Sequence, residues 1–388
     1  MNPRRISASA RLNNFTLFAT YAVLTPFLPL YLKGRGLAPS QIGFLLGVLE
    51  LAGIGGPILL GRLADTRSAH RSFLAAAFAG AALMFIPLGL AGKYWVYILC
   101  IAVMGFSYRA TIPLLDSHVS RILADPARQY GTMRVFGSIG FIVMSLVMEA
   151  AGLAAGVSPE VIAISFAVTS VLAGATVGLM PPAHSAPEES TGKAEREVGG
   201  FDLKFWAVIA VIFLGRFAIG AYYSFFSLFL KDRYGLSGIG LIWALGPLSE
   251  MATIYFSGKL IARLGLQALF IASLAAISVR LALFVIAPSL VLVAFAQILH
   301  ALTFGTFHTT SVAYINRKIV SARKGMGMAI YNAVGIGLPS FLASAAGGLI
   351  VQARGYDVLF MSYAAVPLAG IAILAIKGKK LLSIRGYE

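Results

Sequence analysis

Charged residues are scarce in this sequence: Asp, Glu, Lys and Arg make up 12% of the 388 positions, whereas hydrophobic residues make up 59%. A soluble domain needs a polar outer shell, for which about 25% charged residues is usual. The chain cannot supply such a shell, and its mean hydropathy of +0.85 indicates an outer surface that faces lipid. The composition therefore indicates an integral membrane protein.

Cysteine, metal-ligand patterns and catalytic motifs are also rare or absent. The single cysteine, Cys100, lies in an apolar run, which excludes an intramolecular disulfide framework. His300 and His308 are eight residues apart, but no Cys or carboxylate accompanies them, so we expect no metal site. No phosphate-binding loop or nucleophile–base arrangement is found. We therefore expect neither an enzyme nor an ATP-driven pump, and no cofactor.

Acidic residues number 15 against 31 basic ones. The basic residues form no patch interleaved with aromatic residues, so we expect no nucleic-acid partner. They are concentrated instead in short loops that share one side of a membrane if the N-terminus is inside. The positive-inside rule then places both termini in the cytoplasm, with the chain in a bacterial cytoplasmic (inner) membrane.

Long apolar runs are what the sequence has in abundance. Runs able to cross roughly 30 Å of hydrocarbon occur near residues 13–32, 41–60, 72–92, 95–120, 129–152, 160–180, 205–229, 239–258, 267–287, 290–315, 325–351 and 358–376. We expect twelve transmembrane helices, and an all-α fold. The Pro-, Ser- and charge-rich stretch 181–202 predicts a flexible cytoplasmic linker between two six-helix bundles, residues 1–180 and 203–388.

The two predicted halves share an internal repeat. The segment IGFLLGVLELAGIGGPILLGRL (42–63) aligns without gaps to IGLIWALGPLSEMATIYFSGKL (239–260), and both begin Ile-Gly and end Gly-x-Leu. Parallel six-helix repeats are typical of transporters that rock around a central substrate cavity near the membrane midplane. The repeat therefore favours a transporter with alternating access.

The loop GRLADTRSAHR (61–71) resembles the signature loop of the major facilitator superfamily, which it matches at Gly61, Leu63, Asp65 and Arg71. The resemblance extends over the whole chain. It implies that Gly61, Asp65 and Arg71 help to form a cytoplasmic gate.

A narrower resemblance is to the branch that contains lactose permease, the nucleoside–proton symporters and the phenylpropionate transporter. It rests on PFLPLYL (26–32) and YGTMRVFGSIGF (130–141). Asp116, Arg134 and Phe141 have the spacing of the carboxylate, arginine and aromatic residue that bind sugar in lactose permease. The resemblance implies a substrate site at these three residues.

The same branch suggests a proton-coupling site in the C-terminal half. Glu250, Arg280 and His300 resemble the coupling residues of helices eight, nine and ten, whereas Thr303 stands where the permease has its proton-carrying glutamate. Burial favours the protonated form of a carboxyl group and a nearby arginine favours the ionised form. We therefore expect Glu250 to carry the proton, with Asp116 and Glu50 as alternatives.

Charged groups inside a membrane span cost about 2.5–3.5 kcal/mol each and are functional candidates by default. Eight lie within the predicted spans: Glu50, Arg109, Asp116, Arg134, Glu149, Arg216, Glu250 and Arg280. They either line a substrate path or form ion pairs that lock helices together.

Three of these charges have individual expectations. Arg109 lies seven residues from Asp116, on one helical face, and joins the substrate candidates. Arg216 either meets an anionic substrate or pairs with Glu50 or Glu250. Glu149, near the outer end of its span, is expected to be structural.

These observations predict a monomeric, proton-coupled importer of a small polar solute such as a sugar, a nucleoside or an aromatic acid, in contact with membrane lipid. The alternative is a proton-driven exporter of drugs or metabolites. The predicted fifth span lacks the Gly-Pro element usual in the family's antiporters, which favours import.

Overall fold

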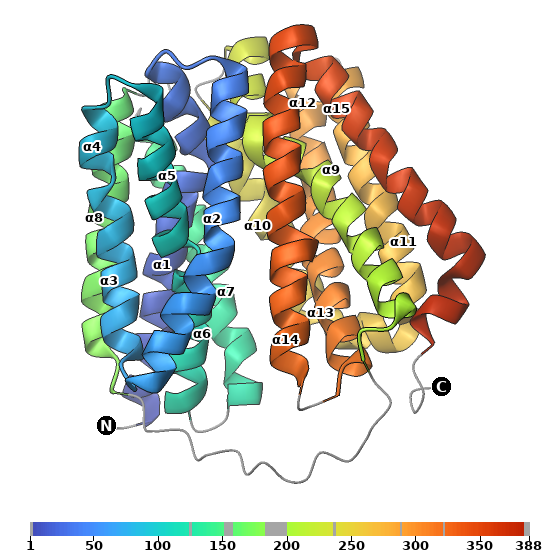
Figure 1. Ribbon diagram of the computed structural model, residues 1–388, viewed down its shortest axis with the longest axis horizontal. Coiled ribbons are helices and arrows are strands. Elements are labelled where there is room, and N and C mark those ends of the chain that lie inside the picture. The colour runs from blue at the N-terminus through green and yellow to red at the C-terminus, as the bar shows by residue number, and fades with distance from the viewer. Residues whose placement is uncertain are drawn as a thin grey trace. The chain divides into compact units, whose positions relative to one another are not determined.

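The computed structural model describes residues 3–123, 126–150, 158–182, 200–235, 238–287, 289–320 and 323–383. Throughout these ranges the regular elements are all helices and no β-strand occurs (Figure 1), which confirms the predicted all-α class. Residue contacts divide the chain into two compact units: Met1–Glu188 with Ser224–Ala244, and Glu189–Tyr223 with Leu245–Glu388. The predicted division at residues 181–202 remains a prediction.

The first unit is built on the helices that Figure 1 colours from blue to green. They are α1 (Pro3–Gly34), α2 (Pro39–Thr66), α3 (His70–Leu83), α4 (Phe85–Gly89), α5 (Tyr94–Tyr108), α6 (Thr111–Ile122), α7 (Pro126–Ala150) and α8 (Pro159–Leu179). Helix α1 packs against α7 and α8, α2 packs against α5, and α3 packs against α5 and α8.

The second unit contains most of the C-terminal helices, in which α-helix alternates with short 3-10 and π-helical turns. They are α9 (Leu203–Tyr234), α10 (Ile239–Tyr255), α11 (Ser257–Ile286), α12 (Leu290–Ala296), η1 (Gln297–Leu299), η2 (Ala301–Thr306), α13 (Phe307–Lys318), α14 (Lys324–Ile330), η4 (Tyr331–Gly337) and α15 (Leu338–Leu382). The end of α9 and the start of α10 belong to the first unit. A buried core that includes Phe270, Phe307, Tyr314 and Tyr331 joins α11, α13 and η4.

Ten helical runs among the described residues are long and apolar enough to cross a membrane, and Ile239–Tyr255 is a shorter apolar helix. One run, Lys324–Leu382, holds both of the last two predicted spans. Gly355 divides α15 inside it, since its φ of +81° lies in the left-handed region that favours glycine. The structure thus supports a multi-helix membrane fold, and the count of twelve remains a prediction.

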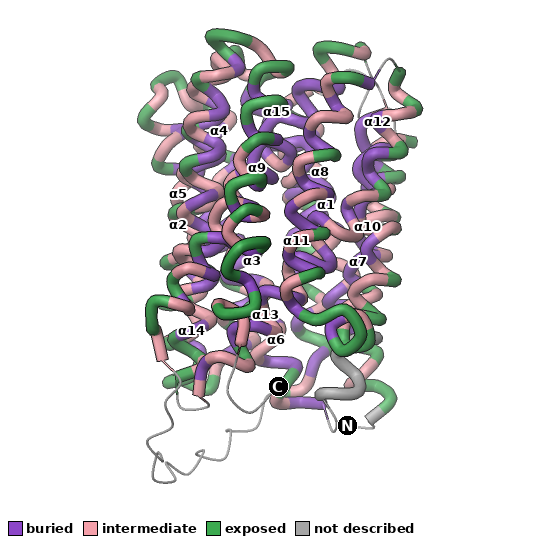
Figure 2. Tube along the Cα trace, turned by 90° about the vertical axis from the view of Figure 1, so that its right-hand side faces the viewer, coloured by how far each residue is buried: buried purple, intermediate pink, exposed green. Residues whose placement is uncertain are grey.

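Large apolar side chains lie exposed on the helix surfaces, as expected for groups that face lipid. Leu90, Trp95 and Ile376 are at least 60% exposed. Figure 2 shows exposed and buried stretches alternating along the same helices. Each helix therefore presents one face to its neighbours and another outward.

The fourth predicted span is interrupted by a turn at Arg109–Ala110, where α5 ends and α6 begins. Pro113 explains the interruption, because it has no N–H to donate to the Arg109 carbonyl and its ring would clash with that carbonyl. Arg109 lies in this turn and Asp116 in α6, and the backbone keeps αR dihedral angles across the turn, so the common face of the two residues remains a prediction.

Helices α2 and α5 cross so closely that glycine is needed on both. A Cβ atom on Gly56 would lie 1.8 Å from the carbonyl oxygen of Phe106, and one on Gly105 would lie 2.3 Å from the carbonyl oxygen of Leu49. Small residues at such crossings let two helix backbones touch. The contact fixes α2 against α5 just where Glu50 and Arg109 leave these helices.

We expect Gly56→Ala to lower the free energy of unfolding by about 1–3 kcal/mol, because the added methyl group overlaps the Phe106 carbonyl. Gly61→Ala is the matched control on the same helix, since a Cβ atom there meets nothing within 4 Å. Thermal unfolding in detergent should show a lower midpoint for Gly56→Ala alone. Equal midpoints for the two variants would contradict the close crossing.

The start of α9 is fixed by Asp202. Its Oδ1 accepts a hydrogen bond from the Phe205 N–H at 2.8 Å, as an N-cap does, and Lys318 Nζ donates to its Oδ2 at 2.7 Å. Burial raises the pKa of the Asp202 carboxyl, but the hydrogen bonds from Lys318 and Phe205 outweigh it and hold that pKa below its ordinary value. This contact joins the start of α9 to the end of α13.

Candidate functional site

An ion pair joins α2 to the end of α5 in the first unit. Arg109 Nη2 donates to Glu50 Oε1, and the two side chains are 29% and 21% exposed. The Arg109 guanidinium also lies over the ring of Tyr21, 5.9 Å from its centroid. Glu50 thus has a direct cationic partner, and its assignment as an alternative proton carrier remains a prediction.

Arg134 of α7 stacks on an aromatic ring of α1. Its guanidinium carbon lies 4.0 Å from the centroid of Phe18, a distance typical of a cation–π contact. Phe141, two turns further along α7, is buried, whereas Asp116 and Arg134 are half-buried. The assignment of Asp116, Arg134 and Phe141 to the substrate remains a prediction.

A row of aromatic rings connects Arg134 to Arg109. Phe18 stacks on Tyr21 with centroids 5.5 Å apart, and Tyr21 stacks on Tyr108 at 4.2 Å. Arg134 lies over Phe18 at one end, and Arg109 lies over Tyr21. Phe18 and Tyr21 were not predicted from the sequence, because nothing in it distinguishes them from the other aromatic residues.

In the second unit, the three residues grouped by the family resemblance are in contact. His300 Nε2 lies 3.4 Å from Glu250 Oε2, and Arg280 Nη1 lies 3.0 Å from His300 Nδ1. All three side chains are buried, with at most 7% of each residue exposed. A carboxylate, an imidazole and a guanidinium thus form a row from α10 through the turn after η1 to α11.

The direction of the hydrogen bonds fixes the tautomer of His300. A guanidinium can only donate, so His300 Nδ1 accepts from Arg280 and the ring proton lies on Nε2, facing Glu250. Arg280 makes no direct ion pair with Glu250 within this described cluster, since its other hydrogen bonds go to Thr303 Oγ1 and Gln297 Oε1. His300 therefore lies between the carboxyl group and the arginine.

Gln297 and Tyr222 complete the surroundings of Arg280 and were not identified from the sequence. The Arg280 guanidinium carbon lies 4.0 Å from the centroid of the Tyr222 ring. Gln297 precedes His300 by three residues, so its helical spacing is a signal that could have found it. Tyr222 comes from α9 and carries no such signal, because only packing brings it to Arg280.

Arg216 of α9 has a separate set of partners. Its Nη2 lies 3.4 Å from both Tyr331 Oη and His308 Nδ1, and these two atoms are 2.8 Å apart. Its guanidinium carbon is 5.4 Å from the Phe304 ring centroid and 5.8 Å from that of Phe307. The predicted pairing with Glu250 does not occur among the described residues of this unit, and pairing with Glu50 remains a prediction.

The two π-helical segments of the second unit lie next to these polar groups. Segment η2 follows His300 and carries Phe304, whose ring stacks on His300 and on His308 with centroids 5.5 and 5.8 Å apart. Segment η4 begins at Tyr331. Because π-helical turns are frequent at functional sites, their position supports a functional role for this cluster.

The predicted gating loop is held within the first unit. Asp65 Oδ1 accepts from Arg121 Nη2 at 2.6 Å and lies 2.9 Å from His70 Nε2. Arg71 Nη2 donates to a backbone carbonyl of α8 at 2.9 Å. Both Asp65 and Arg71 therefore tie the loop to neighbouring helices, while gating by these residues and Gly61 remains a prediction.

Two polar contacts link α9 and α10 to helices of the first unit. Lys33 at the end of α1 forms an ion pair with Asp232. Glu149 Oε2 accepts from the Gly240 N–H at 3.2 Å, and a Cβ atom on Gly240 would lie 2.2 Å from the Ser145 carbonyl oxygen. Glu149 thus has a structural contact.

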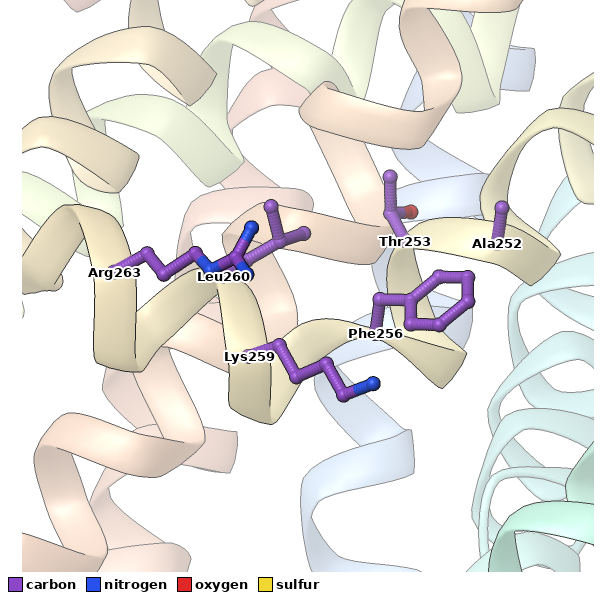
Figure 3. Close-up of a pocket in the computed structure, with 6 residues that line it drawn as sticks. All are labelled: Ala252, Thr253, Phe256, Lys259, Leu260 and Arg263. Carbon is purple, nitrogen blue, oxygen red and sulfur yellow. The ribbon is translucent and has the colours of Figure 1, made fainter.

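A pocket lies where α10 meets α11 (Figure 3). It is lined by Ala252, Thr253, Phe256, Lys259, Leu260 and Arg263. The Lys259 ammonium lies 5.5 Å from the centroid of the Phe256 ring. The two cations of this pocket, Lys259 and Arg263, lie on α11. None of the interior charged residues lines the pocket.

Comparisons with known proteins agree with the geometry. Residues 10–362 match the model of the MFS_1 like family. The chain belongs to this family. The probable 3-phenylpropionic acid transporter of Escherichia coli (strain K12) is 27% identical over 92% of this chain and 94% of its own length. The maltose permease of Geobacillus stearothermophilus is 24% identical over 94% of this chain and 93% of its own length.

Solved structures show the same fold. The crystal structure of the nucleoside transporter NupG superposes with a TM-score of 0.77 at 16% identity, covering 98% of this chain and all of that one. A POT family peptide transporter superposes with a TM-score of 0.76 at 12% identity, over 99% of this chain and 98% of the other. The chain is therefore a multi-pass membrane transporter of the MFS_1-like family and not an enzyme.

Proposed function

We propose that this transporter is a proton-coupled symporter that imports a small polar solute by alternating access. Its two halves, residues 1–180 and 203–388, are proposed to rock about a central cavity in the bacterial inner membrane, with residues 181–202 as a cytoplasmic tether and both termini in the cytoplasm. Relatives named as phenylpropionic acid, maltose and nucleoside transporters support a small solute as cargo.

The observation that carries the coupling proposal is the row Glu250–His300–Arg280. Glu250 is buried, and its polar neighbour is the Nε2 side of a neutral histidine rather than an arginine. A carboxyl group in such a place can lose or gain a proton with a small rearrangement of His300. Glu250 is thus better suited to exchange protons than Glu50, which Arg109 holds directly.

The substrate site is proposed around Asp116, Arg134 and Phe141, with Phe18 as an added contact. The Arg134 guanidinium presents a planar set of donors that suits a carboxylate or neighbouring hydroxyl groups. Its stacking on Phe18 limits the rotamers it adopts, so its donors are held ready for a ligand.

Uptake into proteoliposomes tests the proposal. Radiolabelled sugars, nucleosides and aromatic acids are offered with and without an inward proton gradient, and a protonophore serves as control. We expect at least one solute to accumulate only with the gradient, and Arg134→Ala to reduce its initial uptake by about tenfold or more, the effect of removing a charge-assisted hydrogen bond.

Arg354→Ala provides the matched control, because Arg354 is an exposed arginine outside the proposed site. Gradient-driven efflux of a preloaded solute would contradict import and show that the protein is an exporter. Solute movement that ignores the gradient in either direction would contradict proton coupling.

A further inference from the structure

Among the residues that the structure describes, Arg216 is a buried cation without an anionic partner. It is 5% exposed, and none of the ion pairs formed by the described residues includes it. Its Nε atom is buried and has no hydrogen-bond partner among those residues. A charge in this position is costly unless a counter-ion offsets it.

The groups around Arg216 are neutral. Arginine can only donate, so Tyr331 Oη accepts from Arg216 and donates its own proton to His308 Nδ1, 2.8 Å away. A histidine that accepts at Nδ1 is uncharged. The interaction therefore orients the guanidinium and leaves its positive charge unbalanced.

Glu250 does not supply the missing charge. It lies beside His300, in the neighbouring cluster that also contains Arg280. The mid-span charges of the second unit are thus two guanidinium groups and one carboxyl group, which leaves one positive charge over. A ligand with a single negative charge would bring this interior to neutrality.

The apolar surroundings of Arg216 indicate what the rest of the ligand is like. The half-buried ring of Phe304 lies 5.4 Å from the guanidinium carbon, and the half-buried Tyr223 packs edge-on against Phe304 at 6.5 Å between centroids. Segments η2 and η4 carry Phe304 and Tyr331, so two π-helical turns converge on one cation. The Phe304 ring stacks on His300 and His308, so a ligand beside the guanidinium would meet its edge and the Tyr223 ring. A lone guanidinium next to aromatic side chains fits a carboxylate on an apolar body.

We propose that Arg216, positioned by Tyr331 and His308, binds the carboxylate of a small organic monocarboxylate whose apolar body packs against the side chains of Phe304 and Tyr223. This inference rests on the proposed transport function and narrows its substrate class. It places the anionic group of the substrate in the second unit, in addition to the Arg134 site of the first.

Binding to the purified transporter in lipid nanodiscs tests the inference without requiring transport. The probes are benzoate, cyclohexanecarboxylate and 3-phenylpropanoate, each titrated by calorimetry beside its own primary amide. We expect at least one carboxylate to bind about 10- to 100-fold more tightly than its amide, the range for a hydrogen bond to a charged group. Arg216→Gln should remove this preference for the carboxylate over its amide.

Three further variants keep the test independent of folding defects. Arg216→Lys retains the positive charge but lacks the planar set of donors of a guanidinium. It should retain part of the preference for the carboxylate over the amide. Tyr331→Phe removes one orienting oxygen and should weaken carboxylate binding less than Arg216→Gln does. Arg354→Gln, which removes an exposed arginine of the same unit, should bind like the wild type.

The outcomes separate this inference from the proposed function. Gradient-driven uptake of neutral sugars or nucleosides, with no carboxylate bound more tightly than its amide, would overturn the Arg216 site and leave symport standing. Carboxylate binding that depends on Arg216 but is not followed by gradient-driven uptake would support the site and contradict the coupling. An undiminished preference in Arg216→Gln would also overturn the inference.

Discussion

Glu250→Gln is expected to abolish gradient-driven accumulation of the substrate while preserving exchange of labelled for unlabelled substrate across the membrane. Glutamine keeps the size and hydrogen-bonding ability of the side chain next to His300 but cannot release a proton. With one proton per substrate, an inward gradient of about two pH units supports up to about 100-fold accumulation. The variant should show none of it.

Glu149→Gln is the matched control, because Glu149 is also an intramembrane glutamate but contacts a backbone N–H near the end of α7. It should accumulate substrate as the wild type does. Proteoliposome uptake and counterflow, measured on the same preparations, separate the two activities. Accumulation by Glu250→Gln equal to that of the wild type would remove Glu250 from the coupling path, whereas loss of counterflow as well would assign it to substrate binding.

Glu50→Gln is expected to destabilise the protein by about 3 kcal/mol, the lower end for a broken buried ion pair, because Arg109 loses the carboxylate that offsets its charge. The pair is about a quarter exposed, which keeps the effect at that end of the range. Denaturation in detergent should show it as a reduced free energy of unfolding, without a change in the proton dependence of transport in the remaining folded protein.

The double variant Glu50→Gln/Arg109→Gln should recover most of this loss, since it removes both charges together. A double variant that is as unstable as the sum of its two single variants would contradict an energetic coupling between the residues. If Glu50→Gln were instead as stable as the wild type and transported substrate without accumulating it along the proton gradient, Glu50 would replace Glu250 as the proton site.

Much of the transporter could be predicted from its sequence. The apolar runs predicted a helical membrane protein, because a spanning segment must satisfy its backbone hydrogen bonds internally. The resemblance grouped Glu250, Arg280 and His300, which the structure brings into contact. The turn at Arg109–Ala110 was not predicted, although Pro113, four residues after Arg109, is the signal that could have found it.

The sequence by itself determined the membrane environment, the helical class and the identity of the charged residues inside it, since these follow from hydropathy and composition. Only the tertiary structure decided which charges are neutralised. Arg109 forms an ion pair with Glu50. Arg280 donates hydrogen bonds to His300 and to other neutral acceptors, and Arg216 contacts Tyr331 and His308 but no carboxylate among the described residues. Ion pairing depends on distances of a few ångströms between different helices, and helix packing alone sets those distances.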